Sequence, residues 1–104
     1  VRLPVDPHTC ERNAERWSRW LAHDPLTLVE SSACQQSLRA LRCLFVDCGS
    51  QDEYALHYGA RRFARRLGEL SIPHQYEEFA DGHSGIDYRL DHSLPLLYRA
   101  IAGD

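Results

Sequence analysis

Two short polar segments of the chain carry side chains that could do acid–base chemistry. The first, DCGSQDE at 47–53, contains Asp47 and Asp52, and the second, ADGHSG at 80–85, contains His83. A carboxylate beside an imidazole holds the ring in one tautomer and stabilises the imidazolium that forms when the ring takes a proton from a nucleophile. Asp52 and His83 are therefore the candidate acid and base, and Asp47 is the alternative acid.

The elements that precede these segments must bring them together. The run LRCLFVD at 41–47 is almost continuously apolar and ends at an acid, which is typical of a strand buried on both faces of a parallel sheet. HQYEEF at 74–79 predicts a second strand, and residues 53–70 between them have apolar side chains at helical steps. Because loops at the carboxyl ends of parallel strands meet at one edge of a sheet, the two polar segments are expected to lie side by side.

Helices are predicted on both sides of this unit. Thr9 can cap a first helix that reaches Leu21, and its Trp17 and Trp20 are expected to pack against the sheet. A last helix is expected to start near Ser93, with Pro95 in its first turn. The predicted fold is therefore α/β, in the order helix, strand, helix, strand, helix, with two parallel strands.

Two parallel strands form too small a sheet to be stable by themselves, and an apolar strand such as 41–47 needs neighbours along its edges. Residues 1–104 are therefore expected to form one unit that either completes a larger sheet or associates with copies of itself.

Composition narrows the range of partners and cofactors. The 104 residues include twelve Arg, no Lys and fifteen acidic residues, for a net charge of −3, which argues against nucleic acid and acidic membrane surfaces as partners. No apolar run approaches the roughly 18 residues of a membrane helix. The four cysteines and six histidines show no zinc-binding spacing, so we expect no metal and no cofactor. Four free thiols indicate a reducing, cytoplasmic compartment.

One region of the sequence resembles a known family. The segment DCGSQDEY at 47–54, followed by a helix, a strand and a Gly-His-Ser loop at 82–84, is similar to the C-terminal end of the esterase D-like α/β-hydrolases. That group includes S-formylglutathione hydrolases and enterochelin-esterase-like enzymes, and the resemblance extends from Leu41 to Ile101. It implies that Asp52 is the acid and His83 the histidine of a catalytic triad.

The nucleophile of that family has no counterpart in this chain. In α/β-hydrolases the serine lies upstream of the acid in a G-x-S-x-G turn, and no serine here has that frame. Ser84 follows Gly82 by two positions, but Ile86 stands where the second glycine should be. The resemblance therefore implies that this chain is the C-terminal part of a larger hydrolase domain. Its substrate would be a small carboxylic ester or thioester, and the nucleophilic Ser would lie outside these residues.

Two alternatives remain open. Cys48 follows the first strand and precedes a helix N-terminus that could lower its pKa, so Cys48 and His83 could form a thiol hydrolase with Asp47 as the acid. In the other alternative the chain is a catalytically silent α/β module that associates with itself.

Overall fold

The computed structural model describes residues 2–103 of the chain. Seven regular elements and a short 3₁₀ turn follow one another within these residues. In chain order they are α1 (Ala14–Leu21), α2 (Pro25–Leu28), α3 (Ser32–Arg39), β1 (Phe45–Gly49), α4 (Leu56–Glu69), β2 (Gln75–Phe79), η1 (Asp87–Arg89) and α5 (Leu90–Ala102). The fold is α/β, as the sequence predicts, with α2 and α3 as further helices before the first strand.

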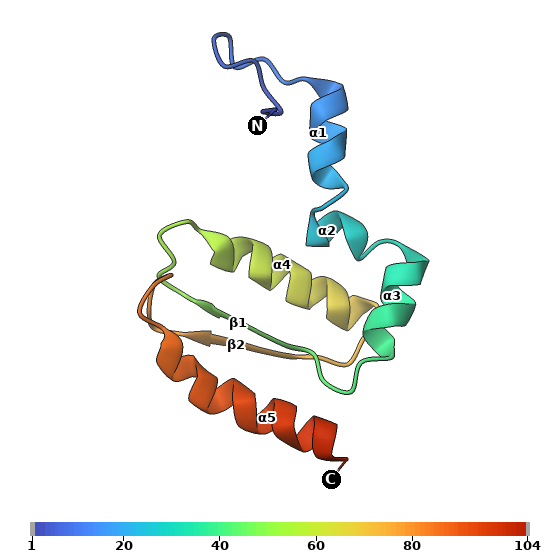
Figure 1. The fold of residues 1–104 in the computed structure, drawn as a ribbon, viewed down its shortest axis with the longest axis vertical. Helices are drawn as coiled ribbons and strands as arrows, with labels where there is room; N and C mark the ends of the chain where they lie inside the picture. Colours follow the sequence, from blue (N-terminus) through green and yellow to red (C-terminus); the bar gives the residue numbers. More distant parts are fainter. Residues whose placement is uncertain (1, 104) are drawn as a thin grey trace.

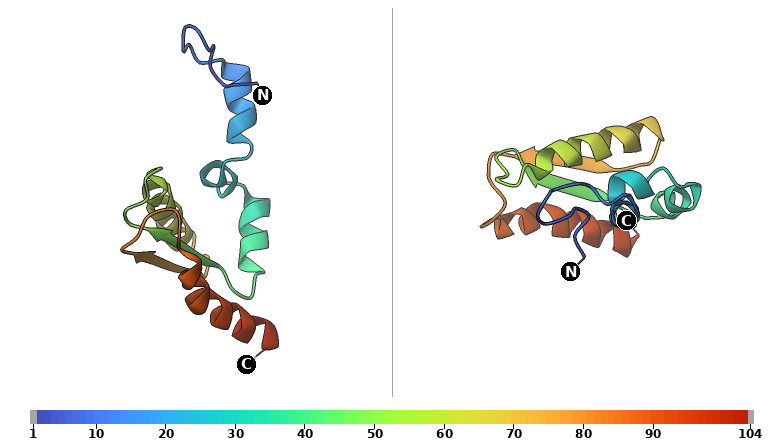
Figure 2. Two further views of the ribbon diagram at one scale, coloured as in Figure 1. Left: turned by 60° about the vertical axis from the view of Figure 1, so that its left-hand side comes forward. Right: turned by 90° about the horizontal axis from the view of Figure 1, so that it is seen from above.

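The two strands are parallel neighbours, with Phe45 opposite Gln75 and Gly49 opposite Phe79. The crossover between them is α4, which covers one face of the sheet, while α5 covers the other (Figures 1 and 2). The prediction of a parallel strand–helix–strand unit is therefore confirmed. Both strands point the same way, so the loops that follow them lie at the same end of the unit (Figure 1).

The hydrophobic core is small and lies at the opposite end, near the amino ends of the strands. Val29, Leu67 and Ile72 are at most 2% exposed, and half-buried apolar residues surround them: Leu38, Leu44, Phe63 and Leu70. These side chains come from the end of α2, from α3, from the second half of α4 and from the residues that enter each strand. The core therefore fixes the starts of the strands and leaves their carboxyl ends to be held by polar contacts.

The molecule exposes more surface than a closed domain of its size. Its radius of gyration is 16.7 Å, whereas about 13 Å is typical of a compact chain of this length. Its accessible surface is 7755 Å², against roughly 6,000 Å² for a folded monomer of 12.0 kDa. Part of the excess belongs to α1, which projects away from the sheet (Figure 2). Trp17 and Trp20 on α1 are exposed, so the prediction that they pack against the sheet is wrong.

The first helix starts later than the sequence predicts. Asn13, not Thr9, is its N-cap, and the Asn13 side chain accepts a hydrogen bond from the backbone N–H of Arg16. Thr9 belongs to a preceding turn in which its own backbone N–H donates to the carboxylate of Asp6. Local hydrogen bonds of this type compete with helix formation, and here they delay the helix by one turn.

Three other boundaries also differ from those predicted. The first strand spans 45–49 rather than 41–47, so Asp47 lies in its middle. The helix after it begins at Leu56, because Ala55 adopts a left-handed conformation with φ of 58° and ends the preceding turn. The last helix begins at Leu90 and contains Pro95, whereas a start near Ser93 was expected. This earlier start follows from η1, which runs directly into α5.

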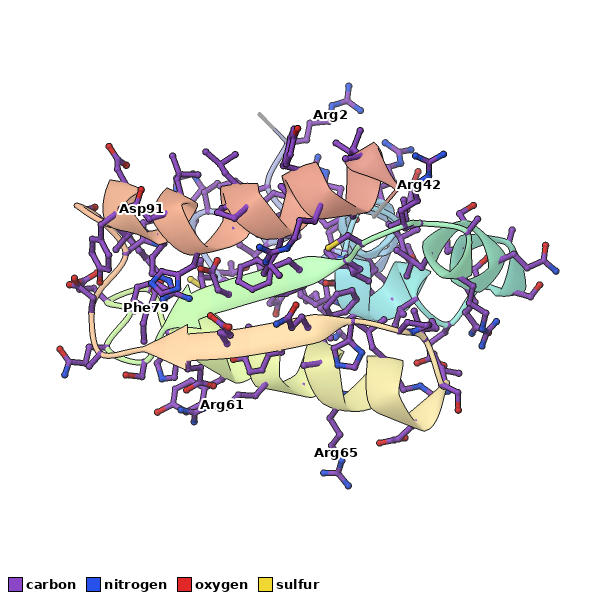
Figure 3. The ribbon with its side chains drawn as sticks, turned by 90° about the horizontal axis from the view of Figure 1, so that it is seen from below. Arg2, Arg42, Arg61, Arg65, Phe79 and Asp91 are labelled. Carbon is purple, nitrogen blue, oxygen red and sulfur yellow. The ribbon has the colours of Figure 1, made fainter. Side chains whose placement is uncertain are left out.

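Ion pairs hold α4 to its neighbours. Arg61 makes two hydrogen bonds to Glu78 on β2, at 2.6 and 2.7 Å, and Arg66 makes two to Glu30, at 2.6 and 2.8 Å. Arg65 projects from α4 away from the sheet and is 3.3 Å from Glu69 (Figure 3). Arg61, Arg65 and Arg66 of α4 are therefore each paired with an acid. Within residues 2–103, no helix combines the length and apolar character that crossing a membrane requires.

The Arg61–Glu78 pair predicts a loss of stability in acid. Hydrogen bonds from Arg61 and Tyr76 lower the pKa of Glu78 to about 2, whereas an unfolded glutamate titrates at about 4.3. Between these values the unfolded chain binds more protons than the folded chain, so the free energy of unfolding falls as the pH falls from about 4.3 to 2. We expect the urea midpoint to decrease over this range and Glu78→Gln to weaken that dependence. An equal dependence in the variant would contradict this assignment.

Candidate functional site

Asp52 and His83 meet at the carboxyl ends of the two strands. Nδ1 of His83 lies 2.9 Å from Oδ2 of Asp52. The carboxylate is 3% exposed and the imidazole 45% exposed, so the acid is covered while the ring remains open to a reactant. Asp52 belongs to the turn after β1 and His83 to the loop after β2, so the two sequence segments expected to lie side by side do so.

The ionisation of Asp52 determines which atoms of the pair carry protons. Burial by itself raises the pKa of this carboxyl, but hydrogen bonds from His83 and from the backbone N–H groups of Tyr54 and Leu56 outweigh burial and lower it. Asp52 is therefore ionised at neutral pH and can only accept hydrogen bonds. The proton between the two residues must lie on Nδ1 of His83. The lone pair of Nε2 is then available to take a proton, as a general base requires.

The turn around Asp52 also fixes the acid itself. The N–H of Tyr54 donates to Oδ1 at 2.8 Å, and that of Leu56 lies 3.5 Å from the same atom. Asp52 does not cap a helix beginning at residue 53, because the left-handed residue Ala55 separates it from α4. Its second oxygen is left to the imidazole.

The loop that carries His83 is held from both sides. Asp81 accepts a hydrogen bond from the N–H of Gly82 at 2.8 Å and another from the hydroxyl of Tyr88 at 2.9 Å. Glu53 accepts the backbone N–H of His83 at 3.0 Å. The ring of Tyr54 meets the imidazole edge-on, with ring centres 4.8 Å apart. The loop is therefore closed on itself by Asp81 and fastened to the turn after β1 by three consecutive residues, 52–54.

Two glycines allow these loops to approach. A Cβ on Gly49 would lie less than 3.0 Å from the backbone oxygens of Asp81 and Gly82, and a Cβ on Gly82 would overlap the carboxylate of Glu53. The clash at Gly49 is with backbone atoms and could be relieved only by moving one loop away from the other, whereas the clash at Gly82 is with the end of the Glu53 side chain. The approach of His83 to Asp52 thus depends on the missing side chain at 49, and the position of the Glu53 carboxylate depends on the missing side chain at 82.

Asp47, the alternative acid, binds an arginine instead of His83. Oδ2 of Asp47 lies 3.1 Å from Nε of Arg89. Nη2 of the same arginine donates to Glu77 at 2.6 Å. The guanidinium also lies 4.6 Å from the centre of the Phe79 ring, at the end of β2 (Figure 3). Asp47 therefore joins β1 to the start of α5, and Asp52 is the carboxylate that binds His83.

The surroundings of Cys48 do not favour a thiolate. Burial raises the pKa of its thiol, and the nearby carboxylates of Asp52, Glu78 and Asp47 raise it further. The prediction that a helix N-terminus lowers this pKa is therefore wrong, since α4 begins only at Leu56 and acids surround the sulfur. All four cysteines are free thiols. Within the described part of the chain, no three His, Cys, Asp or Glu side chains are grouped so that they could hold a metal ion.

No protein-family model matches the chain, and a search of curated proteins finds no similar sequence. Sequence reasoning identified Asp52 and His83 but missed the roles of Glu53, Tyr54 and Asp81. No sequence signal distinguishes these three from ordinary loop residues, because their contacts depend on how the two loops fold over each other.

Substitution of the glycines tests how closely the loops must approach. Gly49→Ala is expected to destabilise the chain by about 1–3 kcal/mol, as overpacking does, and to weaken the Asp52–His83 contact. Gly59→Ala is the matched control: Gly59 lies inside α4 with open space around its Cβ position, so alanine there should stabilise by about 0.5–1 kcal/mol. Urea unfolding of both variants measures the difference. Equal effects of the two substitutions would contradict the close approach at Gly49.

Proposed function

We propose that this chain supplies the acid and the histidine of a serine hydrolase with the α/β-hydrolase fold, whose nucleophilic serine lies on polypeptide outside these residues. The observation that supports the proposal is the hydrogen bond between a buried, ionised Asp52 and an exposed imidazole of His83 at the carboxyl edge of a parallel sheet. Sites in α/β proteins lie at this edge. The order of acid, helix, strand and histidine agrees with the resemblance to esterase D-like enzymes.

The proposed reaction is acyl transfer from a small carboxylic ester or thioester. Nε2 of His83 takes the proton of the serine hydroxyl as its oxygen attacks the carbonyl carbon, and then gives that proton to the departing alcohol or thiol. Water attacks the acyl-serine in the same way, which releases the acid and restores the serine. Throughout, Asp52 keeps the proton on Nδ1 and stabilises the imidazolium.

The edge of β1 is where we expect the serine-bearing polypeptide to dock. Leu44 and Ser50 make backbone hydrogen bonds toward β2, and backbone groups alternate between the edges of a parallel strand. The N–H and C=O groups of Phe45 and Asp47 therefore face the other edge, where no strand lies within residues 2–103. A further strand at this edge would cover these groups and extend the sheet.

The opposite strand, β2, is less suited to such growth. β2 carries Glu77, which binds Arg89 at the start of α5, and Glu78, which binds Arg61 on α4. Charged side chains that turn inward are a device by which natural edge strands avoid further pairing. β1 has the composition of an interior strand, whereas β2 has that of an outer one.

Helix α5 offers a second surface to the same partner. Its half-buried side is formed by Ser93, Leu96 and Ala100, whereas a row of larger apolar side chains is exposed: Leu90, Leu94, Leu97, Tyr98 and Ile101. The accessible surface of the whole chain exceeds that of a compact monomer by roughly 1,700 Å², and a standard interface takes about 800 Å² from each partner. Part of this surplus belongs to α1 (Figure 2), and the exposed row on α5 contributes to the rest.

A second candidate is a silent α/β module that associates with itself. The same open edge supports it, because a two-fold axis perpendicular to the sheet would pair β1 with its copy and place the two α5 helices on one face. In this candidate the Asp52–His83 pair serves only to join the loops.

Hydrolysis by the longer protein that contains both this chain and the serine tests the proposal. With p-nitrophenyl acyl esters, His83→Ala is expected to lower kcat by several orders of magnitude and Asp52→Asn by about 10⁴-fold, because each removes part of the proton transfer. Ser84→Ala, on the same loop, is the matched control and should retain activity. Undiminished hydrolysis in His83→Ala would exclude the proposed function, and a self-associated chain without hydrolysis would favour the silent module.

A further inference from the structure

The loop that carries His83 is fastened to the turn after β1 by a second carboxylate. We propose that Glu53 is a positioning residue, which sets the direction of the His83 imidazole by holding the backbone of the same residue. The inference rests on the proposed function, because a fixed direction matters only if Nε2 must reach a reactant. Glu53 itself would not touch the substrate.

The geometry gives His83 two independent anchors. Oδ2 of Asp52 binds its ring nitrogen at 2.9 Å, and Oε2 of Glu53 binds its backbone N–H at 3.0 Å. With the ring anchor alone, rotation of the side chain could follow any shift of the loop backbone. With both anchors, the start and the end of the side chain are fixed to adjacent residues of one turn. The ring of Tyr54 also packs edge-on against the imidazole.

Glu53 has no other role among the described residues that would explain its position. Its carboxylate makes no ion pair and no hydrogen bond there except the one to the N–H of His83. Most acidic side chains around the sheet bind an arginine instead, as Glu77, Glu78 and Asp47 do. A carboxylate that binds only one backbone N–H acts on the conformation of that loop.

Gly82 makes this contact possible. The carboxylate of Glu53 occupies the space that a side chain at position 82 would need. The glycine before the histidine thus serves the Glu53 contact, and the sequence Gly82-His83 and the sequence Asp52-Glu53-Tyr54 form a matched pair of segments. The Glu53 carboxylate fills the space beside Gly82 and accepts the backbone N–H of His83.

Hydrogen exchange in the 104-residue chain tests the anchor directly. Glu53→Ala is expected to speed exchange of the His83 amide by roughly tenfold or more, because a charge-assisted hydrogen bond is lost. Glu53→Gln keeps an acceptor oxygen and should exchange at nearly the parent rate. Glu69→Ala, which removes an equal charge from α4, is the control and should leave the His83 amide unchanged. An unchanged His83 amide in Glu53→Ala would overturn the proposal.

Kinetics of the longer, serine-bearing protein separate this inference from the function on which it rests. A displaced catalytic group costs about 100-fold in rate, so Glu53→Ala should lower kcat by about that factor with little change in KM, and Glu53→Gln should restore most of it. Unchanged kcat in Glu53→Ala, with hydrolysis abolished in His83→Ala, would overturn the role of Glu53 and leave the proposed function standing. Hydrolysis that survives His83→Ala would exclude the proposed function, whereas the exchange measurement would still show whether Glu53 holds His83.

Discussion

The hydrogen bond between His83 and Asp52 depends on one constraint, that two parallel strands end at the same edge of the sheet. The α4 crossover meets this constraint, and polar contacts then position the two loops. Arg61 holds α4 to β2, and Arg89 holds the start of α5 to both strands. The glycine at 49 lets the loops touch. The hydrophobic core lies at the other end of the strands, so the site is supported mainly by hydrogen bonds and ion pairs.

The same arrangement makes the two edges of the sheet different in character. β2 uses two acids to bind the helices above and below it, a feature of natural outer strands. β1 carries one such acid, Asp47, and is otherwise uncharged, and α5 exposes a row of apolar side chains. Under both proposed functions, a further layer of polypeptide covers these two features. The proposed hydrolase and the self-associating module differ in what supplies that layer, and they agree on where it binds.

Much of the fold could be predicted from the sequence, because the apolar strand at β1, the helical period of α4 and the alternation of β2 are local patterns. The pairing of Asp52 with His83 followed from topology, since parallel order alone brings those loops together. The exposure of Trp17 and Trp20 could not be predicted, because an apolar stripe does not show what covers it. The late start of α4 depends on the left-handed conformation of Ala55, which no side chain signals. The anchoring by Glu53 and Tyr54 arises only when one loop folds over the other.

The most direct test of the central claim is the protonation state of the two His83 ring nitrogens, measured by nitrogen-15 NMR of the 104-residue chain above neutral pH. An ionised Asp52 at 2.9 Å requires a proton on Nδ1, so in the neutral ring Nε2 is the nitrogen without a proton. The account predicts that tautomer for His83 and its loss in Asp52→Asn, whose amide can donate to Nδ1. A His83 ring that carries its proton on Nε2, and that does not respond to Asp52→Asn, would contradict it.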